Sequence, residues 1–154
     1  MATNFLWGNV VSTLNLLTTE LNSLATGAGS AYGPEVGGNN SPQRAMLALH
    51  LASNSLAFTS ASFVSVYLVP SITTLTGGTY PTYTSGTTPA YSGNGLVGNI
   101  YINPKTQSAN VVDEILPGII IPLGFYKTIL INNTGVTLPP TGNTLNAILT
   151  PTQY

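Results

Sequence analysis

The sequence contains very few charged residues. Asp, Glu, Lys and Arg together make up 5% of the 154 residues, against about 25% in an average globular protein. Nucleic-acid binding needs several Lys or Arg to displace the counterions of phosphate groups, and a basic membrane-surface patch has the same need. The three cations, Arg44, Lys105 and Lys127, are scattered along the chain. We therefore predict neither a nucleic-acid partner nor a membrane partner.

Cysteine is absent and histidine occurs once. Without cysteine the chain has no disulfide and no thiolate for catalysis or metal binding. A serine–histidine–aspartate site would have to use His50, which lies between leucines in a strand-like segment. A zinc site normally takes three or four His, Cys or carboxylate ligands, and the adjacent residues Asp113 and Glu114 point to opposite faces of a strand. We therefore expect no enzyme activity, no catalytic residue, no metal site and no cofactor.

Long apolar runs are also missing. The apolar stretches are much shorter than the roughly 20 residues that a membrane-spanning helix needs. The N-terminal sequence MATNFLWGNVVST has no basic region followed by a sustained apolar core, so we expect no secretory signal. These features predict a protein that is made and folded in the cytoplasm.

Thr, Ser and Asn take the places that charged residues usually fill. Neutral hydroxyls and amides cost less to desolvate than Lys and Glu, and few charges mean little repulsion between copies. We expect a surface that is largely contact surface. The alternative is a monomer that its hydroxyl groups keep soluble.

Near the N-terminus, four leucines recur at helical spacing. Leu14, Leu17, Leu21 and Leu24 are separated by three, four and three residues, which predicts a short amphipathic helix over about residues 12–26. Residues 1–11 precede it as an N-terminal arm. In this arm, Phe5, Leu6 and Trp7 either pack on the protein's own core or dock on a neighbouring molecule.

After about residue 43 the apolar residues recur at every second position, as in strands. The segments that show this pattern, or short apolar runs between Gly and Pro, are 44–53, 62–70, 96–102, 109–115, 125–131 and 145–149. No helical segments alternate with them. We therefore predict a mainly β protein, an antiparallel β-sandwich or jelly-roll-like domain over residues 12–154 with one short N-terminal helix.

A segment rich in Thr, Gly and Tyr separates two of these strands at about residues 71–95. A loop of this length is usually functional or disordered. Exposed tyrosines provide contact area at low entropic cost, so Tyr80, Tyr83 and Tyr91 are candidate interface residues, together with the apolar residues of the arm. Alternatively, the tyrosine rings fold back onto the domain.

The tetrapeptide Asn132-Asn133-Thr134-Gly135 matches a glycosylation signal and also a tight turn. Glycosylation requires secretion, which the N-terminus does not predict. Asn and Gly tolerate the positive φ of tight turns. We therefore predict a hairpin, with Lys127 in its first strand facing solvent or an interface.

Three segments, LTTELNSLATGAG (17–29), FVSVYLVPS (63–71) and IPLGFYKTILINNTGVTLPPTGNTL (121–145), resemble in this order a group of small virion proteins of tailed bacteriophages. In that group a TELNSLA helix precedes a strand ending in YLVPS, and a PPGKFK…NNSG stretch precedes the final strand. The resemblance covers most of the chain from Leu17 onward. The chain departs from the pattern at Leu123-Gly124, where the group tends to have Pro and Lys, and in its longer loop after Pro70.

The resemblance implies a capsid decoration (cement) protein with a β-sandwich or jelly-roll fold. Such a protein would bind the outer surface of the major capsid protein as a homotrimer and stabilise the shell. The expected location is the outer capsid surface of the virion, after synthesis in the host cytoplasm. The alternative is a phage tail or fibre module that contacts host surface glycan through the Tyr-rich loop. A third class, a small hydrolase, would have to depend on His50.

Overall fold

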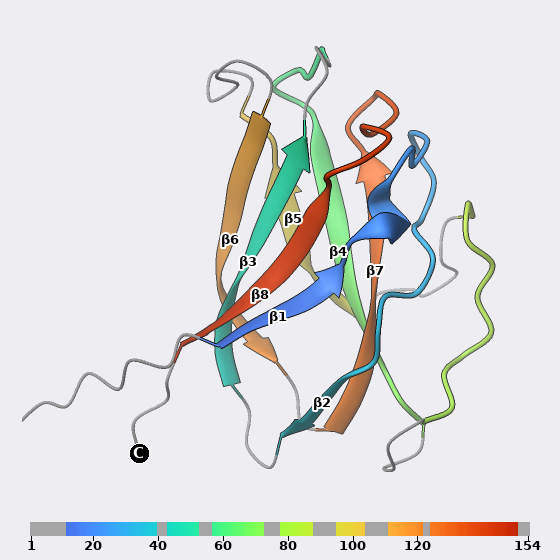
Figure 1. Cartoon of the computed structure of the whole chain (residues 1–154), viewed down its shortest axis with the longest axis vertical. Coiled ribbons are helices and arrows are strands. Elements are labelled where there is room, and N and C mark those ends of the chain that lie inside the picture. Colours follow the sequence, from blue (N-terminus) through green and yellow to red (C-terminus); the bar gives the residue numbers. More distant parts are fainter. Residues whose placement is uncertain are drawn as a thin grey trace, which may run out of the picture.

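The computed structural model describes residues 12–39, 43–52, 57–72, 78–87, 95–103, 111–121 and 124–150. These residues form two four-stranded antiparallel sheets (Figure 1). Sheet A contains, in spatial order, β1 (Ser12–Leu17), β8 (Thr144–Thr150), β3 (Gln43–Ala52) and β6 (Val111–Ile121). Sheet B contains β2 (Val36–Asn39), β7 (Gly124–Asn133), β4 (Phe63–Pro70) and β5 (Leu96–Tyr101). A single 3-10 turn, η1 (Thr19–Leu21), follows β1. The prediction of a mainly β, antiparallel fold is confirmed.

The first half of the chain pairs with the second half in reverse order. Strand β1 pairs with β8, β2 with β7, β3 with β6, and β4 with β5, and these pairs belong alternately to sheets A and B. Two further pairings, β3 with β8 and β4 with β7, complete the sheets. A long antiparallel hairpin wound around the core produces this order.

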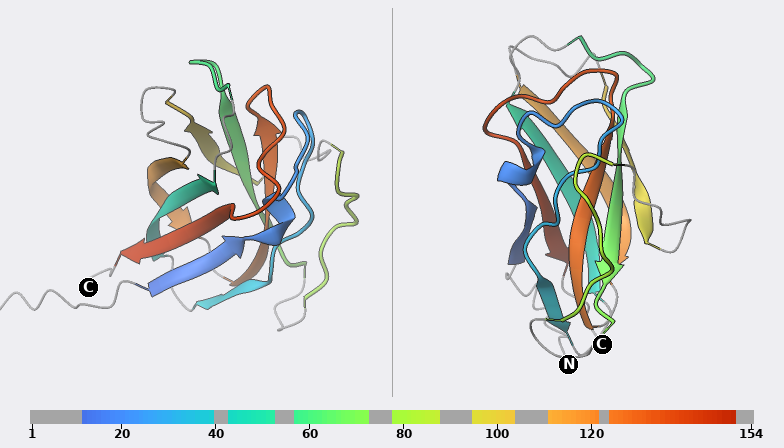
Figure 2. Two further views of the ribbon diagram at one scale, coloured as in Figure 1. Left: turned by 45° about the horizontal axis from the view of Figure 1, so that its top comes forward. Right: turned by 90° about the vertical axis from the view of Figure 1, so that its right-hand side faces the viewer.

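The two sheets pack their apolar faces against each other (Figure 2). Alternate residues of β3 and β4 point inward because side chains in a strand alternate between its faces. Leu47 and Leu49 of sheet A and Val64 and Val66 of sheet B are at most 1% exposed and belong to one core cluster. Burying each such side chain contributes about 1.5–3 kcal/mol before the entropic cost of folding.

The prediction of a helix over residues 12–26 is wrong, because β1 and η1 occupy this segment. Leu14 pairs with Ala147 and Leu17 pairs with Leu145, with a shift of register between them. The two partners are two residues apart whereas the two leucines are three apart, so a β-bulge turns both leucines toward the core. The helix-like spacing of these leucines therefore results from the bulge.

The prediction of a hairpin at Asn132–Gly135 is also wrong, because the turn is present but no strand returns along β7 after it. The chain does turn there, and Gly135 has φ 85°. However, Leu138 donates its backbone N–H to the carbonyl of Leu24 at 3.0 Å instead of pairing with β7. The turn is therefore a corner that carries the chain from β7 in sheet B to β8 in sheet A.

The side chain of Asn132 holds this corner together. It is fully buried, and its Nδ2 donates to the carbonyls of Leu24 and Val136, each at 2.8 Å. Its Oδ1 accepts hydrogen bonds from the backbone N–H and the hydroxyl of Thr134, at 3.0 and 2.7 Å. Such a buried side chain is not available for glycosylation.

Candidate functional site

Residues 78–87, which we call the tyrosine segment, pair through their backbone with Gly29, which itself forms a β-bridge to Ile131 of β7 (Figure 1). The Gly86 N–H donates to the carbonyl of Gly29 at 2.9 Å, and the Gly29 N–H donates to the carbonyl of Thr87 at 3.2 Å. A Cβ on Gly29 would meet the Tyr83 hydroxyl and the Thr87 carbonyl, so only glycine allows this close approach. The segment is therefore anchored on the protein's own surface.

Tyr80 is held by Glu35, which precedes β2. The Tyr80 hydroxyl donates to Glu35 Oε2 at 2.7 Å, and the backbone N–H of Gly78 donates to the same oxygen at 3.0 Å. Burial, together with the hydrogen bond and the negative charge of Glu35, raises the pKa of Tyr80 above its ordinary value. Tyr80 therefore stays neutral and acts as a hydrogen-bond donor at every physiological pH.

Tyr32 brings the rings of the segment together. Its ring centroid lies 6.0 Å from that of Tyr80 and 5.4 Å from that of Tyr83, distances at which aromatic pairs attract each other. The Nζ of Lys127 lies 4.8 Å from the Tyr80 centroid and 5.8 Å from the Tyr32 centroid, within the range of cation–π interactions. Lys127 thus faces outward from sheet B, against these rings.

The structure describes two of the six candidate interface residues, Tyr80 and Tyr83. Tyr80 and Tyr83 are half-buried, with their rings packed against Tyr32. Their role in an interface stays a prediction. The remaining four candidates, Phe5, Leu6, Trp7 and Tyr91, lie outside the described residues, as does the rest of the N-terminal arm, residues 1–11.

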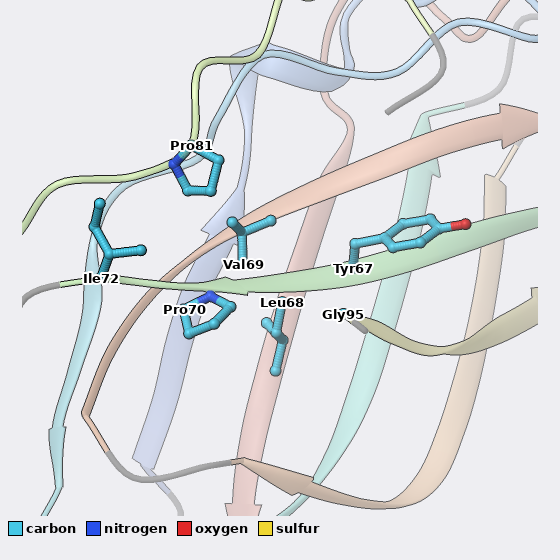
Figure 3. Close-up of a pocket in the computed structure, with 7 residues that line it drawn as sticks. All are labelled: Tyr67, Leu68, Val69, Pro70, Ile72, Pro81 and Gly95. Carbon is cyan, nitrogen blue, oxygen red and sulfur yellow. The ribbon is translucent and has the colours of Figure 1, made fainter. Parts of the chain in front are cut away.

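An apolar pocket of about 180 Å³ lies between the tyrosine segment and β4 (Figure 3). Pro81 of the segment and Ile72 form one side, and Val69 and Pro70 of β4 form the other. The lining is completed by Tyr67, Leu68 and Gly95. Because its walls are almost entirely apolar, the pocket can hold an apolar group but offers no means of orienting a polar one.

The outer face of sheet A carries exposed apolar side chains. Its outward-facing apolar side chains, which we call the apolar face of sheet A, are Met46, Ala48, Val111, Ile115, Ile120 and Ile148. Polar residues, among them Asn146 opposite Ala48, share the outer side of the sheet with them. Ile115 is 57% exposed and Ile120 is 63% exposed. Exposed apolar side chains on one face of a sheet are typical of interaction surfaces.

The single histidine lies on the same face. His50 Nδ1 is 2.7 Å from Asp113 Oδ1, and the two side chains are 41% and 74% exposed. His50 thus faces outward from β3 and is half-buried. Such a surface pair contributes little to stability.

Among the described residues no three His, Cys, Asp or Glu side chains gather where they could hold a metal. No helix in the described ranges is long and apolar enough to span a bilayer.

A further surface was missed in the sequence. On the outer face of sheet B, Tyr101 is 62% exposed and packs against Phe63, with ring centroids 5.6 Å apart. Beside these rings, the Ser65 hydroxyl donates to Asn99 Oδ1 at 2.8 Å and accepts from Asn133 Nδ2 at 3.1 Å. The available signal was the alternation of Asn99 and Tyr101 with apolar residues in the strand at 96–102.

Comparisons of the chain with protein-family models, with curated proteins and with solved structures found no match.

Proposed function

We propose that this protein is a structural component of a bacteriophage virion. It decorates and stabilises the capsid by binding the outer surface of the major capsid protein as a homotrimer. The proposal starts from the resemblance of residues 17–29, 63–71 and 121–145 to small phage virion proteins. It carries no enzymatic step and no cofactor.

The strand order supports this proposal. The orders β1-β8-β3-β6 and β2-β7-β4-β5 are those expected of an eight-stranded jelly roll, in which two sheets share two Greek keys. We infer that the domain is a jelly roll. This architecture is common among viral capsid domains, although a fold by itself does not identify a function.

The observation that carries the proposal is the apolar face of sheet A. Ile115 and Ile120 lie on β6, an edge strand of the sheet, and both are more than half exposed. Burying such side chains against a neighbouring subunit gains about 25 cal/mol per Å² of apolar area.

Charges do not oppose this burial. Two charged or titratable residues of β3 face outward, Arg44 near one end of the strand and His50 near the other. Asp113 of β6 pairs with His50. Met46, Ala48, Ile115 and Ile148 lie between these ends, whereas Ile120 lies opposite Arg44 and Val111 lies beyond His50. The charges that binding would desolvate are therefore few, those of Arg44 and of the His50–Asp113 pair. A surface of this kind suits the many neutral contacts that repeat around the symmetry axes of a shell.

Binding to phage heads tests the proposal directly. Purified protein is mixed with heads that lack it, and retention on the heads is compared between the wild type and an Ile115→Asp/Ile120→Asp double variant. We expect the wild type to bind and to raise the temperature at which the heads open. The double variant should fold normally and fail to bind, because two carboxylates would have to be desolvated in the interface.

Ile72→Asp is the matched control, because Ile72 is 71% exposed and lies near the tyrosine segment, away from sheet A. This variant should bind as well as the wild type. The proposal is wrong if the wild type shows no affinity for heads, or if all three proteins bind equally. Counting copies per particle gives a second check, because a number typical of tail parts would contradict a shell component.

A further inference from the structure

The outer face of sheet B exposes aromatic and amide groups side by side. In the register of the sheet, Tyr101 of β5, Phe63 of β4 and Asn133 of β7 form one row. Asn99 and Ser65 lie opposite each other in the next row. Neighbouring strands are about 4.8 Å apart and the two rows are roughly 7 Å apart. These five residues, which we call the amide–tyrosine patch, therefore cover an area comparable with one or two sugar rings.

The aromatic part of the patch offers a ring face to solvent. Tyr101 is 62% exposed, and its ring is tilted by 40° against Phe63, which is half-buried beside it. Phe63 thus limits the orientations of the Tyr101 ring. A preorganised tyrosine provides an apolar surface and a polar tip, and loses little entropy when a ligand binds.

The polar part of the patch is fixed by hydrogen bonds. Ser65, which is 6% exposed, joins Asn133 Nδ2 and Asn99 Oδ1 across three strands. Within the described residues these bonds use one end of each amide. The donor Nδ2 of Asn99 and the acceptor Oδ1 of Asn133 are left for a ligand. Both amides are half-buried, so their positions are set by the sheet.

We propose that the amide–tyrosine patch binds a neutral saccharide. The C–H face of a sugar ring would stack on Tyr101, and its hydroxyls would accept a hydrogen bond from Asn99 and donate one to Asn133. The ligand is neutral because, among the described outward-facing residues of β4, β5 and β7, the charged side chain is Lys127. It lies six residues from Asn133 along β7, roughly 20 Å away. The inference does not depend on the proposed shell role.

Affinity electrophoresis tests the inference with defined probes. The native protein is run through gels that contain dextran, mannan or galactan, with dextran sulfate as the charged comparison. We expect at least one neutral polysaccharide to retard the wild type, with little dependence on salt. Tyr101→Ala should weaken this binding by about tenfold or more, which corresponds to about 1.4 kcal/mol. Tyr101→Phe keeps the ring and should retain most of the binding.

Two further variants distinguish binding at the patch from binding elsewhere on the surface. Asn99→Ala should weaken binding while thermal unfolding shows an intact fold. Tyr83→Ala removes a ring of the tyrosine segment and should leave binding unchanged. The inference is overturned if no neutral polysaccharide retards the protein, or if only dextran sulfate does. It is also overturned if binding survives Tyr101→Ala and is lost in Tyr83→Ala, because the ligand would then bind the tyrosine segment.

Discussion

The outer faces of sheets A and B both carry isoleucines at outward positions, but only one of them covers its isoleucines. On sheet A, Ile120 is 63% exposed. On sheet B, Ile129 is fully buried, although it points to the same outer side as Lys127 and lies outside the main core cluster. The rings of Tyr32 and Tyr80 lie over Lys127, so we infer that Tyr32 and the tyrosine segment supply the cover.

The difference shows how one fold gives two kinds of surface. A sheet that is covered on its outer side buries its apolar side chains there, and these side chains contribute to stability. A sheet that is left open keeps its apolar side chains available for contact with another molecule. At the end of sheet B that contains Tyr101, this sheet also presents an open surface.

The largest effect is expected at the corner that joins the two sheets. Asn132→Ala removes four buried hydrogen bonds that tie together the segments of the corner. We expect a loss of about 4 kcal/mol in the free energy of unfolding, measured with urea, because each of the four hydrogen bonds contributes about 0.5–1.5 kcal/mol. Asn133→Ala, next in sequence and half-buried, should cost less than about 1 kcal/mol. Equal losses would show that the corner does not lock the sheets together.

Covered and open isoleucines provide the sharpest comparison of the two faces. Ile129→Ala should lower the free energy of unfolding by about 3 kcal/mol, the usual cost of a large-to-small change at a buried site. Ile120→Ala should change it by less than about 0.5 kcal/mol, as expected for a surface substitution. Both values come from the same urea denaturation experiment. If the two variants were equally stable, the outer face of sheet B would not be covered by these segments.

Alkaline pH should lower the free energy of unfolding through Tyr126, which faces the core from sheet B. Burial raises the pKa of Tyr126 to about 12, from an ordinary value of about 10, and its hydroxyl has no hydrogen-bond partner among the described residues. The folded state therefore holds this proton more tightly than the unfolded state. The resulting stability is fully present below pH 10 and is lost as the pH rises to about 12.

Over this range the loss should amount to roughly 2 kcal/mol, since each pKa unit corresponds to about 1.4 kcal/mol. Tyr126→Phe should remove this part of the pH dependence and cost little stability at neutral pH, because the hydroxyl forms no hydrogen bond within the described part of the chain. Unfolding curves at neutral and alkaline pH measure both quantities. An unchanged alkaline slope in the variant would mean that Tyr126 does not titrate in this range.

The smallest effect on stability is expected from a change at Glu35, which accepts hydrogen bonds from the tyrosine segment. Glu35→Gln removes the negative charge that accepts hydrogen bonds from Tyr80 and Gly78. We expect the pKa of Tyr80 to fall toward its ordinary value in an ultraviolet-detected titration, and stability to drop by about 1 kcal/mol. Proteolytic cleavage within the tyrosine segment should become faster. Glu20→Gln, which removes a carboxylate bonded to Thr18, should leave the titration unchanged.

Much of the fold was predictable because alternation of apolar and polar residues indicates a strand directly. The predicted strands at 44–53, 62–70, 96–102 and 145–149 correspond closely to β3, β4, β5 and β8. Strand β2 was missed, because its sequence VGGN has little strand propensity and it forms by pairing with β7. Strand β6 continues past Pro117, where the register shifts and Gly118 takes φ 74°. Pro and Gly look like an end of a strand in a sequence but also fit a bulge.

The candidate surfaces were less predictable, because their partners are far apart in the chain. Tyr80 was equally compatible with an exposed loop and with a ring folded back, and the choice depended on Tyr32, Glu35 and Lys127. The Tyr80–Glu35 pair spans 45 residues. No local pattern around Tyr80 contains that information. The amide–tyrosine patch was likewise hidden, because its members lie on three strands that only the sheet register brings together.

By itself, the sequence determined the β class, the segments that form most strands, and the scarcity of charge that leaves neutral surfaces on the molecule. These are local properties, set by alternation, turn residues and composition. The tertiary structure decided that the leucines at 14 and 17 enter a bulged strand, that Asn132 closes a corner between sheets, and that one outer face is covered while the other stays open. These features depend on contacts between distant residues, and burial and hydrogen bonding outweigh local propensity wherever the two disagree.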